Sequence, residues 1–182
     1  MTDLDGAGRD EQRPGRIVAG VSGSLGSLAA LHRAVAEGRR TGAEVLAVLA
    51  WIPPGGEHGY RLAPCPPLLA TWEADAAARL REALGEAFGG APADVRLSAQ
   101  VIRGDSGPAL VHTADRATDL LVVGAGGGSL LRRGLRPSVT AHCVKHASCP
   151  VLAVPRPPLH RELAAIHRRI AWHLPTTSAS SR

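Results

Sequence analysis

The glycine-rich stretch of residues 122–140, VVGAGGGSLLRRGLRPSVT, carries the clearest chemistry in this chain of 182 residues. Glycine lets a ligand approach the main chain and lets consecutive N–H groups point at one anion. A helix predicted to begin near Pro137-Ser138 would add free N–H donors and the positive end of its dipole. Positive charge comes from three arginines in the stretch: Arg132, Arg133 and Arg136. These features predict a phosphate site, with a flexible turn as the simpler alternative.

Two common nucleotide motifs do not fit this stretch. No Gly-Lys-Ser/Thr sequence occurs, which excludes a Walker A loop. A dinucleotide fingerprint beginning at Gly124-x-Gly126 would need a third glycine where Ser129 stands, and the stretch follows the fourth predicted strand instead of the first. A phosphate site here would therefore be of another class.

The elements that must position this stretch are read from hydrophobic periodicity. Short apolar runs predict five buried strands, at residues 16–21, 44–51, 95–102, 119–123 and 150–154. Helical spacing predicts four helices within the domain. The first begins at a Ser24 or Ser27 cap, loosens at Gly38 and ends by about Gly42, and the second runs from Leu69 to Gly89-Gly90. The third runs from a Ser106 cap, with Pro108 in its first turn, to about Thr118, and the fourth begins near Pro137-Ser138. Five prolines and three glycines predict an irregular loop over Ile52–Pro67.

This alternation predicts an α/β fold, a Rossmann-like five-stranded parallel sheet with helices on both faces. Ligands of such sheets bind at the carboxyl ends of strands near a topological switch point, which here means Ser22–Ser24, Ala50–Ile52 and Gly124–Ser138. We expect a domain over residues 16–155, a disordered lead over 1–15 and a carboxyl-terminal extension over 156–182. Helically spaced apolar residues predict an amphipathic helix in that extension: Leu163, Ile166, Ile170 and Leu174.

Composition excludes several classes of protein. A hydrophobic share of 45% and a charged share of 20% exclude wholesale disorder, and no apolar run reaches membrane-spanning length. Three cysteines argue against a disulfide scaffold, and with a polar start that does not resemble a signal peptide they predict a cytoplasmic protein. The net charge of +5 permits polyanion binding, but 3% aromatic residues and the lack of a nucleic-acid motif argue against a nucleic-acid partner.

Other chemistry-bearing residues have simpler interpretations. His142, His146 and Cys149 would need a fourth ligand to hold zinc, so we expect a helix-end face and a core cysteine. Asp105, Ser106 and His112 surround a helix start, where Ser106 is better used as a cap, and no Gly-x-Ser-x-Gly elbow occurs. Trp51 and Trp72 are expected in the core or an interface, and Trp172 belongs to the predicted tail helix.

Three segments resemble the universal stress protein family: IVAGVSGS at Ile17–Ser24, GDSGPALVHTADRATDLLVVGAGG at Gly104–Gly127 and CPVLAVP at Cys149–Pro155. The resemblance covers about Arg16–Val154. It implies an adenine nucleotide alpha hydrolase-like fold and a cytoplasmic, ATP-binding stress-response regulator that is not an enzyme. It also implies a homodimer that pairs the last strand across a two-fold axis, which would cover an otherwise exposed sheet edge.

The family's nucleotide motif is Gly, two residues, Gly, nine residues, then Gly-Ser or Gly-Thr. Gly124, Gly127 and Ser138 match it, whereas Pro137 stands where the motif has glycine. The resemblance also implies a position near the base and two at the mouth of the site. In all it assigns the nucleotide to Ser22, Ser24, Ala50, Gly124, Gly127, Gly128, Ser138 and Val139.

Two departures from the family pattern weaken the nucleotide interpretation. Pro137 lacks an N–H donor, and Ser22 stands where the family usually has an aspartate that helps hold ribose or a metal. The loss of one or two hydrogen bonds costs about 1–3 kcal/mol, roughly 5- to 150-fold in affinity. The alternative is an interaction module that has lost nucleotide binding and recognises a protein through the tail helix. A weak ATP hydrolase is a third hypothesis, although no base is evident near the loop.

Overall fold

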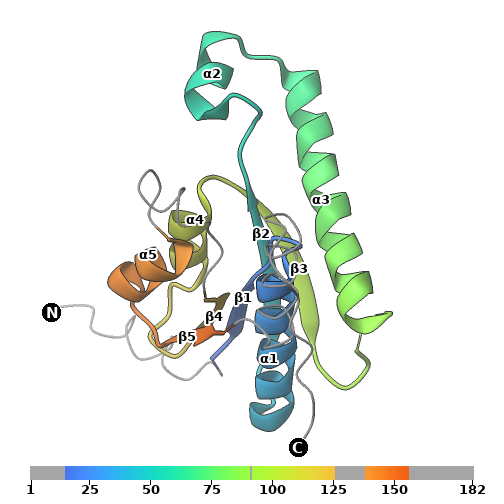
Figure 1. Ribbon diagram of the computed structural model, residues 1–182, viewed down its shortest axis with the longest axis vertical. Helices are drawn as coiled ribbons and strands as arrows, with labels where there is room; N and C mark the ends of the chain where they lie inside the picture. The colour runs from blue at the N-terminus through green and yellow to red at the C-terminus, as the bar shows by residue number, and fades with distance from the viewer. Residues whose placement is uncertain (1–14, 91, 126–137, 156–182) are drawn as a thin grey trace, which may run out of the picture.

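The computed structural model describes residues 15–90, 92–125 and 138–155. Within them lie five strands: β1 (Ile17–Gly20), β2 (Val45–Trp51), β3 (Leu97–Arg103), β4 (Leu120–Gly124) and β5 (Val151–Val154). They also contain five helices: α1 (Leu25–Thr41), α2 (Gly56–Leu62), α3 (Pro66–Phe88), α4 (Ser106–Thr113) and α5 (Val139–His146). Figure 1 shows how these elements are arranged.

The strands form one parallel sheet in the order β3-β2-β1-β4-β5. This confirms the predicted α/β fold with its five-stranded parallel sheet. The chain adds β2 and β3 on one side of β1, then crosses to add β4 and β5 on the other side. The topological switch point therefore lies between β1 and β4, where the carboxyl ends of both strands point to the same edge.

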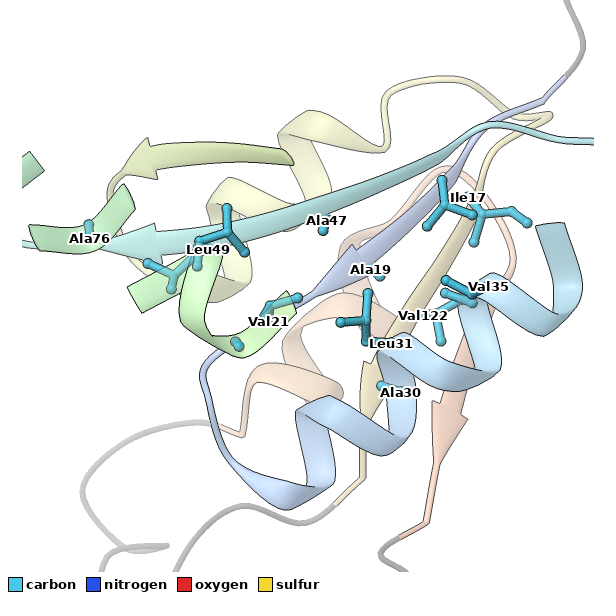
Figure 2. Packing of buried hydrophobic residues seen from close by; sticks show 14 of the residues in the cluster. Ile17, Ala19, Val21, Ala30, Leu31, Val35, Ala47, Leu49, Ala76 and Val122 are labelled. Atoms are coloured by element: carbon cyan, nitrogen blue, oxygen red, sulfur yellow. The ribbon is translucent and has the colours of Figure 1, made fainter. Parts of the chain in front are cut away.

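Each face of the sheet packs against two helices. On one face, α1 and α3 cover a core of small and branched side chains that includes Leu31, Val35 and Ala76 (Figure 2). On the other face, Leu110 of α4 and Cys143 of α5 pack on residues of β1, β2 and β4. Trp51 lies in the first cluster and is buried, as predicted, and Trp72 is packed against that cluster.

Helix α1 follows the sequence closely. The Ser24 hydroxyl caps it by accepting a hydrogen bond from the Ser27 N–H at 3.3 Å, and Gly42 ends it with a φ of 72°. The predicted loosening at Gly38 is wrong, because the helix continues through it. A Cβ on Gly38 would lie 2.8 Å from the Val45 side chain, so glycine there lets α1 approach β2.

The prediction of an irregular loop over Ile52–Pro67 is also wrong. The segment contains α2, and α3 already begins at Pro66. The positive-φ glycines Gly55 and Gly56 lie at the start of α2, and Pro66 and Pro67 occupy the first turn of α3, where no N–H partner is needed. The glycines and prolines therefore mark the ends of helices here.

Helix α4 differs from prediction at both ends. Its N-cap is Asp105 instead of Ser106, with no side-chain cap hydrogen bond, and it ends at Thr113 instead of near Thr118. The Arg16 guanidinium donates to the carbonyl oxygen of Thr113 at 3.1 Å and to the Asp115 carboxylate at 2.8 Å. These contacts hold the chain after Thr113 in the non-helical path that leads into β4.

Arg16 and the buried Asp119 join the starts of β1 and β4. The Asp119 carboxylate accepts from the Arg16 backbone N–H at 3.0 Å and from its guanidinium at 2.9 Å. Burial favours the neutral acid, but the hydrogen bonds from Arg16, with its charge, outweigh burial and lower the pKa of Asp119 below its usual value. The pair fixes the edge of the sheet opposite the switch-point ends.

Residues 1–14 of the lead predicted over 1–15 lie outside the described residues. So does the extension predicted over 156–182, which includes Trp172. The domain boundaries therefore stay predictions. Among the helices that the structure does describe, none combines the length and the apolar character needed to cross a bilayer.

Candidate functional site

Gly124 ends β4 at the switch point and touches the first turn of α1. A Cβ on Gly124 would lie 2.5 Å from the carbonyl oxygen of Gly26 and 3.2 Å from the backbone nitrogen of Ser27. Any larger side chain would push these two backbone segments apart. Glycine at this position is therefore explained by the close packing of β4 on α1, and the same contact brings β4 beside the amino end of that helix.

Serines build the turn between β1 and α1. The Ser22 and Ser24 hydroxyl oxygens lie 3.1 Å apart, and the Ser22 backbone N–H donates to the Ser27 hydroxyl at 3.1 Å. The Ser27 hydroxyl in turn donates to the Ser24 carbonyl at 2.8 Å, and Gly23 permits the turn with a φ of 73°. Ser22 and Ser24 are exposed, so the turn presents hydroxyl groups to the carboxyl edge and offers no carboxylate.

Helix α5 begins on the other side of Gly124. Ser138 is its N-cap residue, exposed and without a side-chain cap hydrogen bond. The Thr140 hydroxyl donates to the Gly124 carbonyl at 3.0 Å, which ties the first turn of α5 to the end of β4. Two helix amino ends, those of α1 and α5, therefore flank one strand end, and both supply N–H groups without intrahelical partners.

The structure places the predicted site residues unevenly. Gly124 lies against the turn that holds Ser22 and Ser24, and Thr140 connects Gly124 to the helix that Ser138 caps. Val139, in the first turn of that helix, is 38% exposed. Ala50 lies near the carboxyl end of β2, the neighbour of β1, and is half-buried. Gly127, Gly128, Pro137 and the three loop arginines lie outside the described residues.

Sequence reasoning missed Thr140 and the connecting role of Ser27. No local pattern marked Thr140, because its contact with the Gly124 carbonyl depends on how α5 packs at the end of β4. Ser27 had been considered only as an alternative cap. Its hydroxyl instead accepts from one residue of the turn and donates to another, which locks the turn.

His142, Cys143 and Cys149, behind this site, serve packing. The His142 and His146 rings lie 4.5 Å apart, and a Cβ on Gly107 would meet the His142 ring at 2.8 Å. Burial raises the pKa of the Cys143 thiol to about 11 and raises that of Cys149, which disfavours the reactive thiolate. Within the described ranges, no three side chains of the His, Cys, Asp or Glu type gather into a possible metal site.

Solved structures of similar fold include universal stress proteins. One, described as a universal stress protein in complex with cAMP, is 26% identical with a TM-score of 0.51, covering 79% of this chain and 98% of its own. UspA from Lactobacillus plantarum is 23% identical with a TM-score of 0.57, covering 78% and 98%. A hypothetical protein whose biochemical function was assigned from its structure is 21% identical with a TM-score of 0.58, covering 79% and 97%. The last two show likeness of fold alone.

A search of curated proteins gives no match. The family model described as the universal stress protein family matches residues 14–155, more than three-quarters of the chain. The sheet order and the helix ends around Gly124 lie within those residues. The chain belongs to the universal stress protein family.

Proposed function

We propose that this protein is an ATP-binding, non-enzymatic regulator of the stress response that acts as a homodimer. The observation that carries the proposal is the meeting of two helix amino ends at Gly124, the switch point of a parallel sheet. Backbone N–H groups and helix dipoles in such a position favour an anion. The relative in complex with cAMP supports an adenine nucleotide as that anion's source.

Each predicted site residue has a role in this proposal. The main chain at Gly124, Gly127 and Gly128 and the amino end of α5 at Ser138 and Val139 would bind phosphate. Ser22 and Ser24 would offer hydroxyl groups to the ribose side. Ala50, small and half-buried beside the switch point, would leave room for the base.

Regulation would follow from the binding energy. A nucleotide that binds one conformation of the site more tightly would shift the population toward that conformation and so alter a partner surface. The homodimer would form through β5, which has β4 as its one neighbour within the described sheet. Light scattering at tens of micromolar tests the dimer, and a monomer at that concentration contradicts it.

Calorimetry with ATP, AMP and cAMP tests nucleotide binding. Gly127→Trp should abolish the heat by placing a large side chain on the predicted phosphate path. Gly85→Trp is the control, because Gly85 lies on α3 with open space around it. Titrations at two temperatures distinguish a lack of binding from binding whose enthalpy happens to be zero at one of them. If the native protein gives no heat of binding at either temperature, the nucleotide proposal is wrong.

The second candidate is an interaction module without nucleotide. It is favoured by Ser22, whose hydroxyl hydrogen-bonds Ser24 at the position where a carboxylate would otherwise hold ribose or a metal. In that case, deletion of residues 156–182 should abolish capture of the protein partner while the melting temperature stays unchanged. Retained capture by the shortened chain would contradict this candidate.

A further inference from the structure

Strand β3 forms one outer edge of the sheet, at the opposite end from β5. All of its residues pair in an unbroken parallel register with β2, which is its one neighbour within the described part of the chain. Ala99 and Gln100, in the middle of the strand, belong to opposite faces of the sheet, and both are exposed. The centre of this edge strand is therefore accessible from both faces.

The backbone of β3 directs half of its hydrogen-bonding groups away from β2. The Arg96 carbonyl, just before the strand, accepts from the Val45 N–H at 2.8 Å. The Gly104 N–H, just after it, donates to the Trp51 carbonyl at 2.8 Å. Because a parallel ladder bonds to one neighbour through every second residue, the even-numbered residues of β3 face β2. The N–H and C=O groups that point outward belong to the odd-numbered residues: Leu97, Ala99, Val101 and Arg103.

Strand β3 lacks the features that usually keep edge strands apart. Proteins block such edges with lysine, proline, bulges or charged side chains in the strand. Residues 97–103, LSAQVIR, contain no lysine or proline, and the unbroken register with β2 leaves no bulge. Their one charged side chain, Arg103 at the end of the strand, donates to the Glu57 carboxylate at 2.9 and 2.7 Å. Nothing in the middle of β3 therefore opposes pairing with another strand.

The sequence of β3 also fits an antiparallel copy of itself. In the register that pairs the whole strand, Gln100 lies opposite the partner's Gln100, on a two-fold axis. Ala99 then lies opposite the partner's Val101, and Leu97 lies opposite the partner's Arg103. Every outward N–H meets an outward C=O in this register. No like charges are opposite each other, and the two Gln100 amides can hydrogen-bond across the axis.

We propose that β3 is a self-association surface through which two copies of the chain join antiparallel, about a two-fold axis at Gln100. It lies at the other edge from β5, so it adds to the proposed β5 homodimer without competing with it. Two different two-fold interfaces at opposite edges do not close, so dimers that use both would join into chains. Because one strand makes a small interface, we expect this association at higher concentrations than the β5 dimer.

The first test places charge on the two-fold axis. Gln100→Lys and Gln100→Glu each bring like charges together, whereas an equal mixture of the two brings opposite charges together. Sedimentation velocity of the full chain, from tens to hundreds of micromolar, should show assemblies larger than the β5 dimer. Each variant alone should weaken this association about fivefold, and the mixture should restore it. Recovery in the mixture also shows that both variants are folded.

Ser98→Lys is the matched control, because it adds the same charge to the same face of β3 but opposite the partner's Ile102. It should weaken the association less than about twofold. A native chain without larger assemblies, an unchanged Gln100→Lys or a mixture that does not recover overturns the proposal. If the β5 dimer does not exist, the Gln100 variants shift a monomer–dimer equilibrium instead, so failure of the proposed homodimer and failure of the β3 surface are distinguishable.

The second test locates the interface by cross-linking. Residues opposite each other at a non-hydrogen-bonded antiparallel position have Cα atoms about 4.5 Å apart, close enough for a disulfide. Gln100→Cys should therefore give a disulfide-linked dimer on mild oxidation, and Ser98→Cys should not. The unaltered chain is the control for its native cysteines, of which Cys143 and Cys149 are buried. Equal cross-linking at both positions, or none at Gln100→Cys, overturns the proposed register.

Discussion

Two arginine–carboxylate pairs hold opposite edges of the sheet, and they differ in what they can do. Arg16 meets Asp119, whose side chain is fully buried, and one carboxylate oxygen also accepts from the Arg16 backbone. Arg103 meets Glu57 with comparable distances, but a third of each side chain is exposed. The same chemistry therefore fixes the strand starts at one edge and leaves a releasable contact at the other, because burial decides what a broken pair costs.

Breaking the buried pair should have the largest effect on stability. Asp119→Ala leaves the guanidinium and the backbone N–H of Arg16 without their buried acceptor, and we expect a loss of about 3 kcal/mol in the free energy of unfolding. Asp115→Ala is the control, because Asp115 contacts the same guanidinium but is 64% exposed. Urea denaturation measures both. Equal losses in the two variants would contradict the role given to burial.

A side chain at Gly124 tests how tightly the switch-point edge is packed. Gly124→Ala forces a Cβ to within 2.5 Å of the Gly26 carbonyl, and we expect a loss of about 1–3 kcal/mol. Gly85→Ala, in open space on α3, should instead stabilise the protein by about 0.5–1 kcal/mol. The two changes in denaturation midpoint should therefore have opposite signs. A neutral Gly124→Ala would show that α1 and β4 separate easily.

Acid should distinguish the buried pair from the exposed one. The pKa of Asp119 is lowered in the folded protein, while the pKa of an aspartate in an unfolded chain is about 3.9. Its contribution is therefore complete above that pH and is lost as the pH falls through the lower folded value. Thermal melts from pH 6 to pH 3 should show a steeper loss for the native protein than for Asp119→Asn. If Tm falls equally with pH in both proteins, Asp119 does not contribute to the pH dependence of stability.

The smallest effect is expected at the exposed pair. Glu57→Gln should shift the Tm by roughly 2 °C or less, since no residue of α2 is buried and the ion pair is partly exposed. The same variant should still change hydrogen exchange in α2. Scanning calorimetry beside that measurement separates local from global stability. A large Tm shift would show that α2 is part of the cooperative core.

Much of the fold followed from the sequence, because its signals are local. The apolar runs of β1, β2 and β4 and the helical spacing of α1 needed no knowledge of distant residues. Helix α2 was missed because the glycines in it and the prolines on either side of it are turn formers by propensity, whereas Arg103, far along the chain, contacts it. The early end of α4 has a similar cause in the distant Arg16.

The candidate site divides in the same way. The predicted sheet and the family resemblance together marked Gly124, Ser22, Ser24 and Ser138 as residues of an anion site at the ends of strands. That Gly124 touches the Gly26 backbone and that Thr140 binds the Gly124 carbonyl depended on how β4, α1 and α5 pack. The sequence determined which groups and which periodicities were present. Only the tertiary structure decided which distant groups meet and which are buried, because both depend on three-dimensional packing that local spacing does not encode.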